Sequence, residues 1–395
     1  MTVSVRVAGV GMGKFSTPRK SAPYDQIAEE AIRAALVDAD LSLTDINQVY
    51  AGYVYGDSTS GQNSLYRVGM TGVPVVNVNN NCASGSSALW LARQAVASGA
   101  AECVLAFGFE QMQPGALGSH WADRPSPFDR LNAVADAVQA APAEVPIAAR
   151  HFGGAGLAYM EKYGAAPEMF AKVSVKARKH AAQNPHAVFR EPVTEAEVLN
   201  SPHLYGPLTR LQACPPTCGA AAAVVCSAEF AARRGLAASV EITAQSTTTD
   251  QPGSFDPPDM LSLVGYDMTA RAARQVYEEA GIGPEDIPVV ELHDCFTTNE
   301  VISYEALGLT PEGSAEKFIA DGDNTYGGRT VVNPSGGLLS KGHPLGATGL
   351  AQCAELTWQL RGQAGARQVA GAAVALQHNL GLGGACVVSL YRRVR

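Results

Sequence analysis

Short apolar runs alternate with segments of helical period along the first 110 residues of the chain. The predicted strands cover residues 3–10, 45–55, 73–78 and 102–109, and the predicted helices cover 24–39, 63–70 and the segment between residues 82 and 99. Strands that alternate with helices in this way indicate an α/β layer architecture.

A second series with the same organisation follows in the C-terminal part of the chain. Two further core strands, predicted at 220–226 and 240–244, precede this series. The series itself begins with a predicted helix at 267–280 and continues through a strand at 288–292, helices at 297–307 and 347–361, and strands at 369–376 and 385–391. Both series place a cysteine between a strand and a helix, Cys82 in the first and Cys295 in the second. This repetition predicts duplicated halves that face each other, divided into residues 1–250 and 251–395.

The pattern is looser over residues 113–212, where Pro, Gly and His are frequent and helices are predicted only at 145–163 and 168–183. A long insertion of this kind in a compact core is usually a lid or a binding segment. The second helix carries a basic cluster formed by Lys172, Lys176, Arg178, Lys179 and His180. We favour a solvated helix face for this cluster over a phosphate-binding site.

Composition narrows the class of protein. Hydrophobic residues make up 46% of the 395 residues and charged residues 17%, which is typical of a well-packed globule. The net charge of −8 argues against a general affinity for nucleic acid or an anionic membrane. The sequence shows no signal-peptide pattern and no apolar run of about 18 residues, so we expect no membrane span. Eight irregularly spaced cysteines are typical of reduced thiols and predict a cytoplasmic location.

Cys82 lies at the junction between the strand 73–78 and the helix that follows. We expect it on the first turn of that helix, where free N–H groups and the helix dipole favour a thiolate. The five residues after it are Ser, Gly or Ala, so a bulky acyl group can approach the sulfur closely. The alternative is a small packing residue at a tight turn, since free cysteine is commonly buried.

Three later segments also place a His, Cys or Asn at the end of a core element, where α/β folds place reacting groups. The first contains His293 and Cys295, and the second holds His343 in a Gly/Pro loop before a helix. The third is 377–384, which we predict to be a turn between two strands. Metal binding by the consecutive residues at 293–295 is disfavoured, because neighbours along the chain rarely point at one ion.

The remaining cysteines are interpreted as structural. Cys214 and Cys218 have a loose metal-like spacing but no partner pair, so we interpret them as turn and core residues. The other four lie in predicted strands or in a helix and are expected to be packing residues: Cys103, Cys226, Cys353 and Cys386.

Together these motifs resemble those of the thiolases, specifically of the sterol-carrier-protein-2 type. The matching segments are Asn81-Cys82-Ala83-Ser84-Gly85, His293-Asp294-Cys295-Phe296 and Gly342-His343-Pro344-Leu345-Gly346-Ala347-Thr348-Gly349. The resemblance implies a five-layered αβαβα fold built from two βαβαβαββ halves, with an inserted loop domain at about 113–212 that covers coenzyme A. It also implies a homodimer or a dimer of dimers.

The resemblance also implies roles for individual residues. Cys82 matches the nucleophile that accepts the acyl group, and His343 matches the base that takes its proton. Cys295 matches the second cysteine, which acts as acid and base for the acetyl-CoA or propionyl-CoA leaving group. These groups supply the chemistry without a metal and without a permanently bound cofactor, and coenzyme A is the cosubstrate.

Two positions depart from the pattern of common thiolases. His293 stands where most thiolases have an Asn, and it is expected to donate a hydrogen bond to a thioester oxygen. The usual Cys-x-Gly motif is replaced by His378-Asn379-Leu380-Gly381, the pattern of this branch. The backbone N–H groups of Cys82 and Gly381 are expected to form an oxyanion hole.

The resulting hypothesis is a degradative 3-ketoacyl-CoA thiolase of lipid β-oxidation, acting on branched-chain or steroid side-chain CoA esters through an acyl-cysteine. One alternative is a thiolase-like retro-aldolase or acetyltransferase that requires a DUF35 OB-fold partner chain. The joint presence of Cys82, Cys295 and His343 argues against the aldolase. The other alternative is a non-enzymatic lipid carrier, which the intact catalytic positions disfavour.

Overall fold

The structure, a computed structural model, describes residues 3–113, 121–142 and 144–394. The strands of its ten-stranded sheet are β1 (Val5–Met12), β2 (Gln48–Gly52), β3 (Val75–Val78), β4 (Cys103–Glu110), β7 (Gly219–Ser227), β8 (Val240–Thr248), β9 (Val289–Glu291), β10 (Val331–Val332), β11 (Val374–Gly381) and β12 (Ala385–Arg393). They hydrogen-bond in the order β10-β9-β11-β12-β8-β1-β7-β4-β2-β3. A separate hairpin pairs β5 (His203–Tyr205) with β6 (Leu208–Thr209).

The strand order shows that the fold is duplicated. From the two outer edges inward, β3-β2-β4-β7-β1 repeats as β10-β9-β11-β12-β8, so each strand has a counterpart at the same position in the other half. The halves join where β1 pairs with β8 through Arg6 and Val7. The duplication predicted from the two strand–cysteine–helix series is therefore confirmed, while the boundary at residue 250 stays a prediction.

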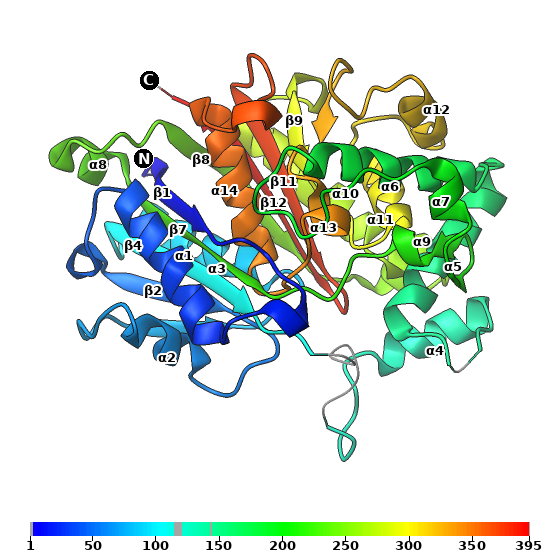
Figure 1. Cartoon of the computed structure of the whole chain (residues 1–395), viewed down its shortest axis with the longest axis horizontal. Helices are drawn as coiled ribbons and strands as arrows, with labels where there is room; N and C mark the ends of the chain where they lie inside the picture. The colour runs from blue at the N-terminus through cyan, green and yellow to red at the C-terminus, as the bar shows by residue number, and fades with distance from the viewer. Residues whose placement is uncertain (1–2, 114–120, 143, 395) are drawn as a thin grey trace.

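Helices fill the space on and between the two sets of strands (Figure 1). In the first half they are α1 (Tyr24–Asp38), α2 (Ser60–Tyr66), α3 (Ser84–Ala97) and α8 (Ala228–Arg234). In the second half they are α9 (Met260–Leu263), α10 (Tyr266–Ala280), α11 (Thr297–Ala306), α12 (Ala315–Ala320), α13 (Gly337–Ser340) and α14 (Thr348–Arg361). Within the described ranges, no helix has the length and apolar character needed to cross a membrane.

Three large buried cores fill the spaces between the layers, and successive side chains of a strand point to opposite faces and so enter different cores. On β4, Leu105 and Phe107 pack towards α1, whereas Val104 and Ala106 pack towards α3 and α14. The third core lies between the strands of the second half and α10. The layers are thus α1, the first strands, α3 with α14, the second strands, and α10 with α11, as the thiolase fold requires.

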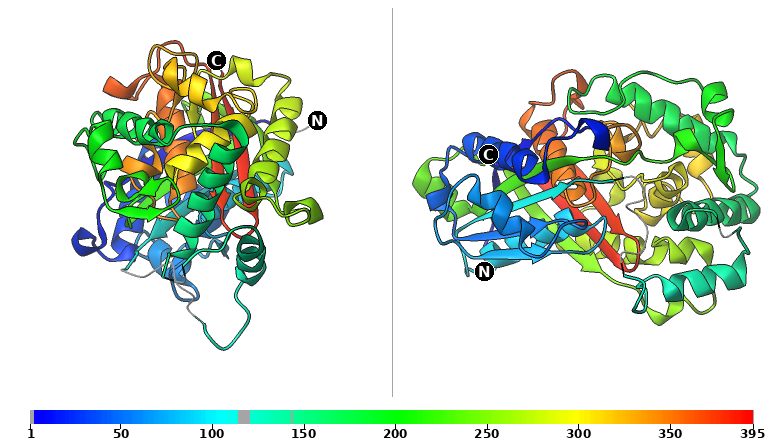
Figure 2. Two further views of the ribbon diagram at one scale, coloured as in Figure 1. Left: turned by 90° about the vertical axis from the view of Figure 1, so that its right-hand side faces the viewer. Right: turned by 60° about the horizontal axis from the view of Figure 1, so that its bottom comes forward.

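The inserted segment forms helices beside the second half of the fold. They are α4 (Asp129–Val138), α5 (Ile147–Tyr163), α6 (Glu168–Ala181) and α7 (Glu195–Leu199). The sequence predicted α5 and α6 but missed the shorter α4 and α7. Helices α5 and α6 pack against α11. In Figure 2 the red strands β11 and β12 accordingly lie between the blue first half and the green and yellow helices.

The predicted turn over 377–384 is wrong for its first five residues, because β11 continues to Gly381 in unbroken pairing with β12. The polar side chains that indicated a turn are buried and bonded instead. Gln377 donates to the Ser86 hydroxyl (2.8 Å), and the ring Nε2 of His378 lies 3.0 Å from the Thr269 hydroxyl. Buried polar groups with partners are compatible with a central strand.

The basic cluster on α6 is not the uniformly solvated face that was predicted. Lys172 and Lys179 are exposed, but Lys176 and His180 are buried. Lys176 forms an ion pair with Glu300 of α11, whose side chain is fully buried. Its ammonium group also contacts the Tyr304 hydroxyl and the Val332 carbonyl at 3.3 Å each. The cluster thus fixes the inserted segment to the core.

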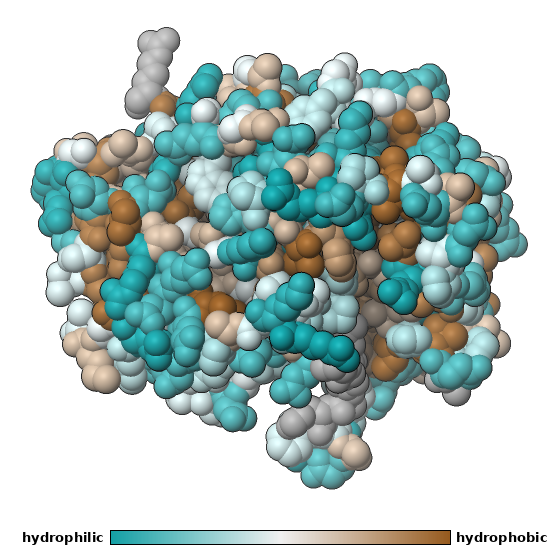
Figure 3. Space-filling model, viewed as in Figure 1, coloured by the Kyte–Doolittle hydropathy of each residue, from teal (hydrophilic) through white to brown (hydrophobic). Residues whose placement is uncertain are grey.

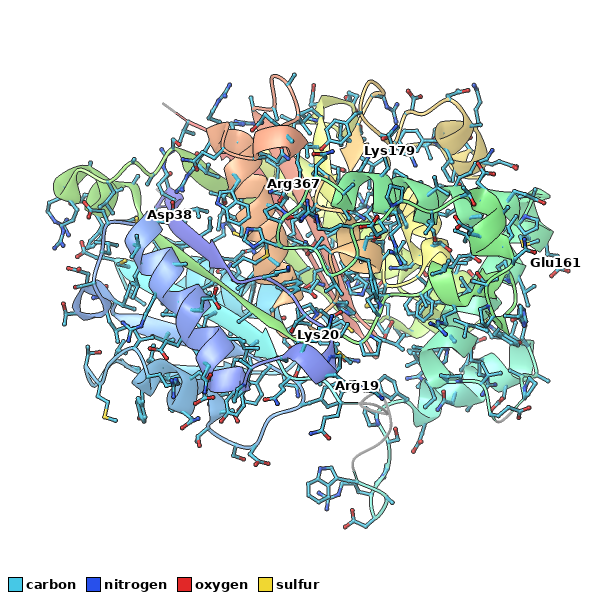
Figure 4. All side chains as sticks on the ribbon, viewed as in Figure 1. Arg19, Lys20, Asp38, Glu161, Lys179 and Arg367 are labelled. Carbon is cyan, nitrogen blue, oxygen red and sulfur yellow. The ribbon has the colours of Figure 1, made fainter. Side chains whose placement is uncertain are left out.

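The exposed surface around these elements is predominantly polar. Figure 3 shows hydrophilic residues over most of one face, with hydrophobic residues in small separate groups. At the outer end of α14, Arg361 forms an ion pair with Asp38 of α1 at 2.7 Å, and Figure 4 labels Asp38. This pair links the two halves at the surface, as Lys176 and Glu300 link the inserted segment to the core.

We predict that Lys176→Ala lowers the free energy of unfolding by about 3 kcal/mol, because it leaves the Glu300 carboxylate buried without its cation. The matched control is Lys179→Ala on the same helix, an exposed residue labelled in Figure 4. The control should change stability by no more than about 0.5 kcal/mol. Urea denaturation of the three proteins measures both values. Equal, small effects of the two substitutions would contradict the buried ion pair.

Candidate active site

Cys82 lies between β3 and α3, two residues ahead of the first helical residue rather than on the first turn as expected. The preceding residue, Asn81, has a φ of 51°, which is uncommon outside glycine. Its side-chain amide donates to the Leu382 carbonyl (3.0 Å), and its own carbonyl accepts the Ser84 hydroxyl (2.6 Å). The loop that presents the sulfur is therefore held from the β11–β12 turn and from α3.

The environment of Cys82 does not favour a thiolate in the free enzyme. Burial of the thiol group raises its pKa to about 12, and the nearby carboxylate of Glu110 acts in the same direction. The expectation of a lowered pKa is wrong, because removing the sulfur from water outweighs the influence of the helix start. The thiol needs an adjacent base to become a nucleophile.

His343 has the orientation and the tautomer of such a base. Its Nδ1 lies 2.7 Å from the Thr348 hydroxyl, and that hydroxyl donates to the Pro344 carbonyl at 3.0 Å. Thr348 must therefore accept the proton on Nδ1, which leaves the lone pair on Nε2. Burial, assisted by Lys341, lowers the pKa of His343 to about 3, so the ring is neutral near pH 7.

His293 has the opposite tautomer. The side-chain amide of Asn379 donates to its Nδ1 at 3.0 Å, so the ring proton resides on Nε2. Burial, with His343 and His378 nearby, keeps the pKa of His293 well below its usual value. A neutral imidazole with a proton on Nε2 is a hydrogen-bond donor for a developing oxyanion.

The structure brings these three residues together. Cys82, His293 and His343 each offer one sulfur or ring nitrogen atom, and the three atoms lie within 4.8 Å of one another. The two rings meet edge to face with their centroids 5.0 Å apart. A thiol, a proton acceptor and a proton donor thus surround one point, although they come from three distant segments of the chain.

Two further thiols lie beside this group. Cys295 is buried, and burial keeps the pKa of its thiol well above the usual value, with Cys214, Cys82 and Asp294 acting in the same direction. Cys214 donates its backbone N–H to the Cys295 carbonyl at 2.8 Å. The interpretation of Cys214 as a turn and core residue did not include this proximity. Its position in a Pro-rich loop directly before β7 was the available signal.

The last motif contributes differently at each of its positions. Gly381 approaches the Cys82 loop so closely that a Cβ atom there would lie 2.2 Å from the Asn80 carbonyl oxygen. Asn379 supports His293, as described above. His378 lies behind the site, where its Nδ1 accepts the His293 backbone N–H at 3.4 Å. Its role is therefore support of the loop that carries His293.

The His343 loop is positioned by a contact between backbones. A Cβ atom on Gly108 would lie 2.0 Å from the Gly346 carbonyl oxygen, and one on Gly85 would lie 2.6 Å from it. Beside this contact, the buried Glu110 carboxylate accepts the N–H groups of Val54 (3.1 Å), Tyr55 (2.9 Å) and Gly346 (3.0 Å). Burial nevertheless raises the pKa of Glu110 to about 7. These contacts fix His343 relative to the Cys82 helix.

Family comparisons agree with this geometry. The family described as thiolase, N-terminal domain matches residues 3–229, and the family described as thiolase C-terminal domain-like matches residues 257–390. The chain belongs to the thiolase family and is an acyltransferase.

Within that family the chain is similar to sterol carrier protein 2. The protein of that name from Rattus norvegicus is 52% identical over 392 residues, which are 98% of this chain and 72% of the relative. Acetyl-CoA acetyltransferase from Methanothermobacter thermautotrophicus is 34% identical over 395 residues, which are 98% of this chain and 99% of the relative.

Solved structures show the same fold. The Ltp2-ChsH2(DUF35) aldolase superposes with a TM-score of 0.83 and 27% identity, covering 99% of this chain and 98% of that one. Human mitochondrial 3-ketoacyl-CoA thiolase in complex with CoA superposes with a TM-score of 0.76 over 100% of this chain and 98% of that one. At 17% identity, the second likeness concerns the fold alone.

We predict that Thr348→Val slows alkylation of Cys82 by iodoacetamide at pH 8 by about tenfold or more. Without the hydroxyl that accepts a hydrogen bond from Nδ1, the tautomer of His343 with its proton on Nδ1 is no longer stabilised. The ring proton can then occupy Nε2, and Nε2 no longer accepts the thiol proton. Thr348→Ser, which retains the hydroxyl, should react like the wild type. Mass spectrometry of the Cys82 peptide measures the rate. If the Val and Ser variants react equally fast, Thr348 does not set the tautomer.

Proposed function

We propose that the chain is a degradative 3-ketoacyl-CoA thiolase that transfers an acyl group to coenzyme A through an acyl-cysteine at Cys82. The observation that carries the proposal is the convergence of the Cys82 thiol with the two histidines within 4.8 Å. The tautomers of these histidines give one acceptor and one donor. We further propose branched-chain or steroid side-chain CoA esters as substrates, on the similarity to sterol carrier protein 2.

In the first half-reaction, His343 Nε2 takes the proton of Cys82 as the sulfur attacks the ketone carbon of the substrate. The backbone N–H groups of Cys82 and Gly381 donate to the tetrahedral oxyanion. The bond between the α-carbon and the former ketone carbon then breaks, and its electron pair forms the enolate of the shorter acyl-CoA. His293 Nε2–H stabilises the thioester oxygen of that enolate.

Cys295 completes the cycle as acid and then as base. Its raised pKa keeps the thiol protonated, so it can protonate the α-carbon of the leaving acyl-CoA. The resulting thiolate takes the proton of the incoming coenzyme A, whose sulfur attacks the acyl-cysteine. The Cys82 sulfur leaves and regains its proton from His343, so every group returns to its starting state.

A partner-dependent reaction is the second candidate, and the structural likeness to the Ltp2-ChsH2(DUF35) aldolase favours it. In that case a DUF35 OB-fold chain would be required for retro-aldol cleavage or acetyl transfer. The presence of Cys82, Cys295 and His343 supports the thiolase instead. A non-enzymatic lipid carrier is the third candidate, and it would not depend on the Cys82 thiol.

We predict that the purified protein, supplied with coenzyme A, consumes acetoacetyl-CoA and 2-methylacetoacetyl-CoA. The reaction is measured as the decrease of the absorbance of the magnesium–enolate complex of the substrate. Cys82→Ala should reduce turnover by about 10⁴-fold or more, because the covalent intermediate cannot form. Cys103→Ala is the matched control, since Cys103 is a free cysteine at the start of β4 and is not part of the group around Cys82. The control should retain most of the activity.

The outcomes separate the candidates. Faster cleavage of the 2-methyl substrate supports the branched-chain proposal, and preference for acetoacetyl-CoA contradicts it. Absence of thiolysis in the isolated chain, restored by an added DUF35 protein, would replace the thiolase with the partner-dependent reaction. Lipid transfer that is equal in the wild type and Cys82→Ala, with no thiolysis, would support the carrier.

The edge strand β3 supports a homodimer as the assembly. It ends the sheet and has no neighbour on its outer side within the described chain. Val76 on this strand is 48% exposed, and Met70 nearby is 78% exposed. An unprotected edge with apolar side chains pairs readily with a second copy about a two-fold axis. The Cys82 loop follows β3 directly, so such pairing would also support the active site.

We predict that Val76→Lys prevents pairing through β3 and leaves a monomer, because the substitution puts a charged side chain on the pairing edge of each copy. Val37→Lys is the matched control, since Val37 is exposed on α1 away from the sheet edge. Analytical ultracentrifugation of the three proteins measures the mass. A dimer that persists in Val76→Lys would contradict pairing through β3.

We also propose a reducing, cytoplasmic location, because all eight cysteines are free. Cell fractionation with detection of the chain tests this proposal, and recovery of the chain from an oxidising compartment would contradict it.

A further inference from the structure

The cluster of Cys82, His293 and His343 has a second chemical capacity. In the part of the chain that the structure describes, no other group of three His, Cys, Asp or Glu residues brings its ligand atoms within 4.8 Å of one another. A thiolate with two imidazoles is a ligand set of zinc, which binds Cys sulfur and His nitrogen in tetrahedral geometry.

We propose that these three side chains bind one Zn²⁺ ion, which reversibly inhibits the enzyme. Tetrahedral zinc places its sulfur and nitrogen ligands about 3.5 Å apart, so the three groups need to close by only about 1 Å. Three protein ligands leave the fourth position for water or a substrate atom. The ion acts as an inhibitor of acyl transfer and not as a cofactor.

The groups behind the histidines are those that a zinc site requires. Ligating histidines are usually held by a hydrogen bond at the other ring nitrogen. Here the Nδ1 atoms of His343 and His293 are held by Thr348 and Asn379, so the Nε2 atoms are left for the metal. His343 is only 4% exposed. Its Nε2 atom is buried and has no hydrogen-bond partner among the described residues.

Asn379 supplies the adjustment that His293 needs. In the metal-free tautomer the proton is on Nε2 of His293, and zinc binding there requires it on Nδ1. The side-chain oxygen of Asn379 is also buried without a partner among the described residues. Rotation of the amide by 180° would bring that oxygen to the Nδ1 proton and satisfy both groups.

Zinc binding at this point blocks the reaction for a direct reason. The Zn–S bond replaces the S–H bond of Cys82, and one thiol proton is released to solvent. The proton of His293 moves from Nε2 to Nδ1, and no electron transfer occurs. The sulfur then cannot attack a carbonyl carbon, and His343 cannot accept a proton, until a chelator removes the ion.

Cobalt is the spectroscopic probe for this site, because a thiolate–Co²⁺ bond gives charge-transfer absorption and tetrahedral Co²⁺ gives intense visible bands. We expect one Co²⁺ per chain, displaced by one Zn²⁺. Cys82→Ala should abolish the charge-transfer band, and His343→Ala should weaken binding at least tenfold. Cys103→Ala is the matched control and should bind cobalt like the wild type.

A substitution that strengthens binding makes the test sharper. Asn379→Asp places a carboxylate behind His293 and should tighten zinc binding by about tenfold, because it fixes the proton on Nδ1. Urea denaturation of each variant shows that it is folded. The site is overturned if Cys82→Ala binds cobalt like the wild type, or if Cys103→Ala loses binding as Cys82→Ala does.

The binding measurements do not depend on the proposed thiolase reaction. Cobalt or zinc bound with the expected mutational pattern supports the metal site even if no 3-ketoacyl-CoA is cleaved. Conversely, thiolysis that is insensitive to stoichiometric zinc and to a chelator overturns the inhibition and leaves the thiolase intact.

Discussion

The active site depends on a contact between backbones that tolerates no side chain. The Gly346 carbonyl lies against Gly108 of β4 and Gly85 of α3, where an added Cβ would approach to 2.0 Å and 2.6 Å. The first half of the fold thereby touches the loop of the second half that carries His343. Since Glu110 accepts the Gly346 N–H in the same place, a shift of this loop would break both packing and hydrogen bonds.

The hydrogen-bonding properties of the two histidines at the candidate site depend on the polar side chains that contact their Nδ1 atoms. The same ring type serves as acceptor at His343 and as donor at His293, because Thr348 and Asn379 hold opposite tautomers. Burial keeps both imidazoles neutral and the thiols of Cys82 and Cys295 protonated in the free protein. A neutral, largely buried cluster of this kind fits both proposals, covalent catalysis and the binding of a soft metal ion.

Much of the fold could be predicted, because the spacing of apolar residues that forms a strand or a helix is a local property of the chain. The long helices of both halves and every strand of the large sheet except β10 were found from it, although β11 begins at Val374 and not at residue 369. The short helix α4 was missed, and the polar residues of β11 were mistaken for a turn, because their partners come from distant segments. Lys176 was predicted to be solvated for the same reason, since Glu300 lies 124 residues away.

The sequence alone determined the duplicated α/β architecture and the candidate residues Cys82, His293, Cys295 and His343, because their motifs are contiguous. Only the tertiary structure decided the protonation states, tautomers and neighbours of these residues. It raised the thiol pKa of Cys82 that the helix start was expected to lower, and it brought Cys214 beside the site. It also assigned a tautomer to each histidine. Protonation depends on burial and on neighbours from other segments, and those quantities exist only once the chain is folded.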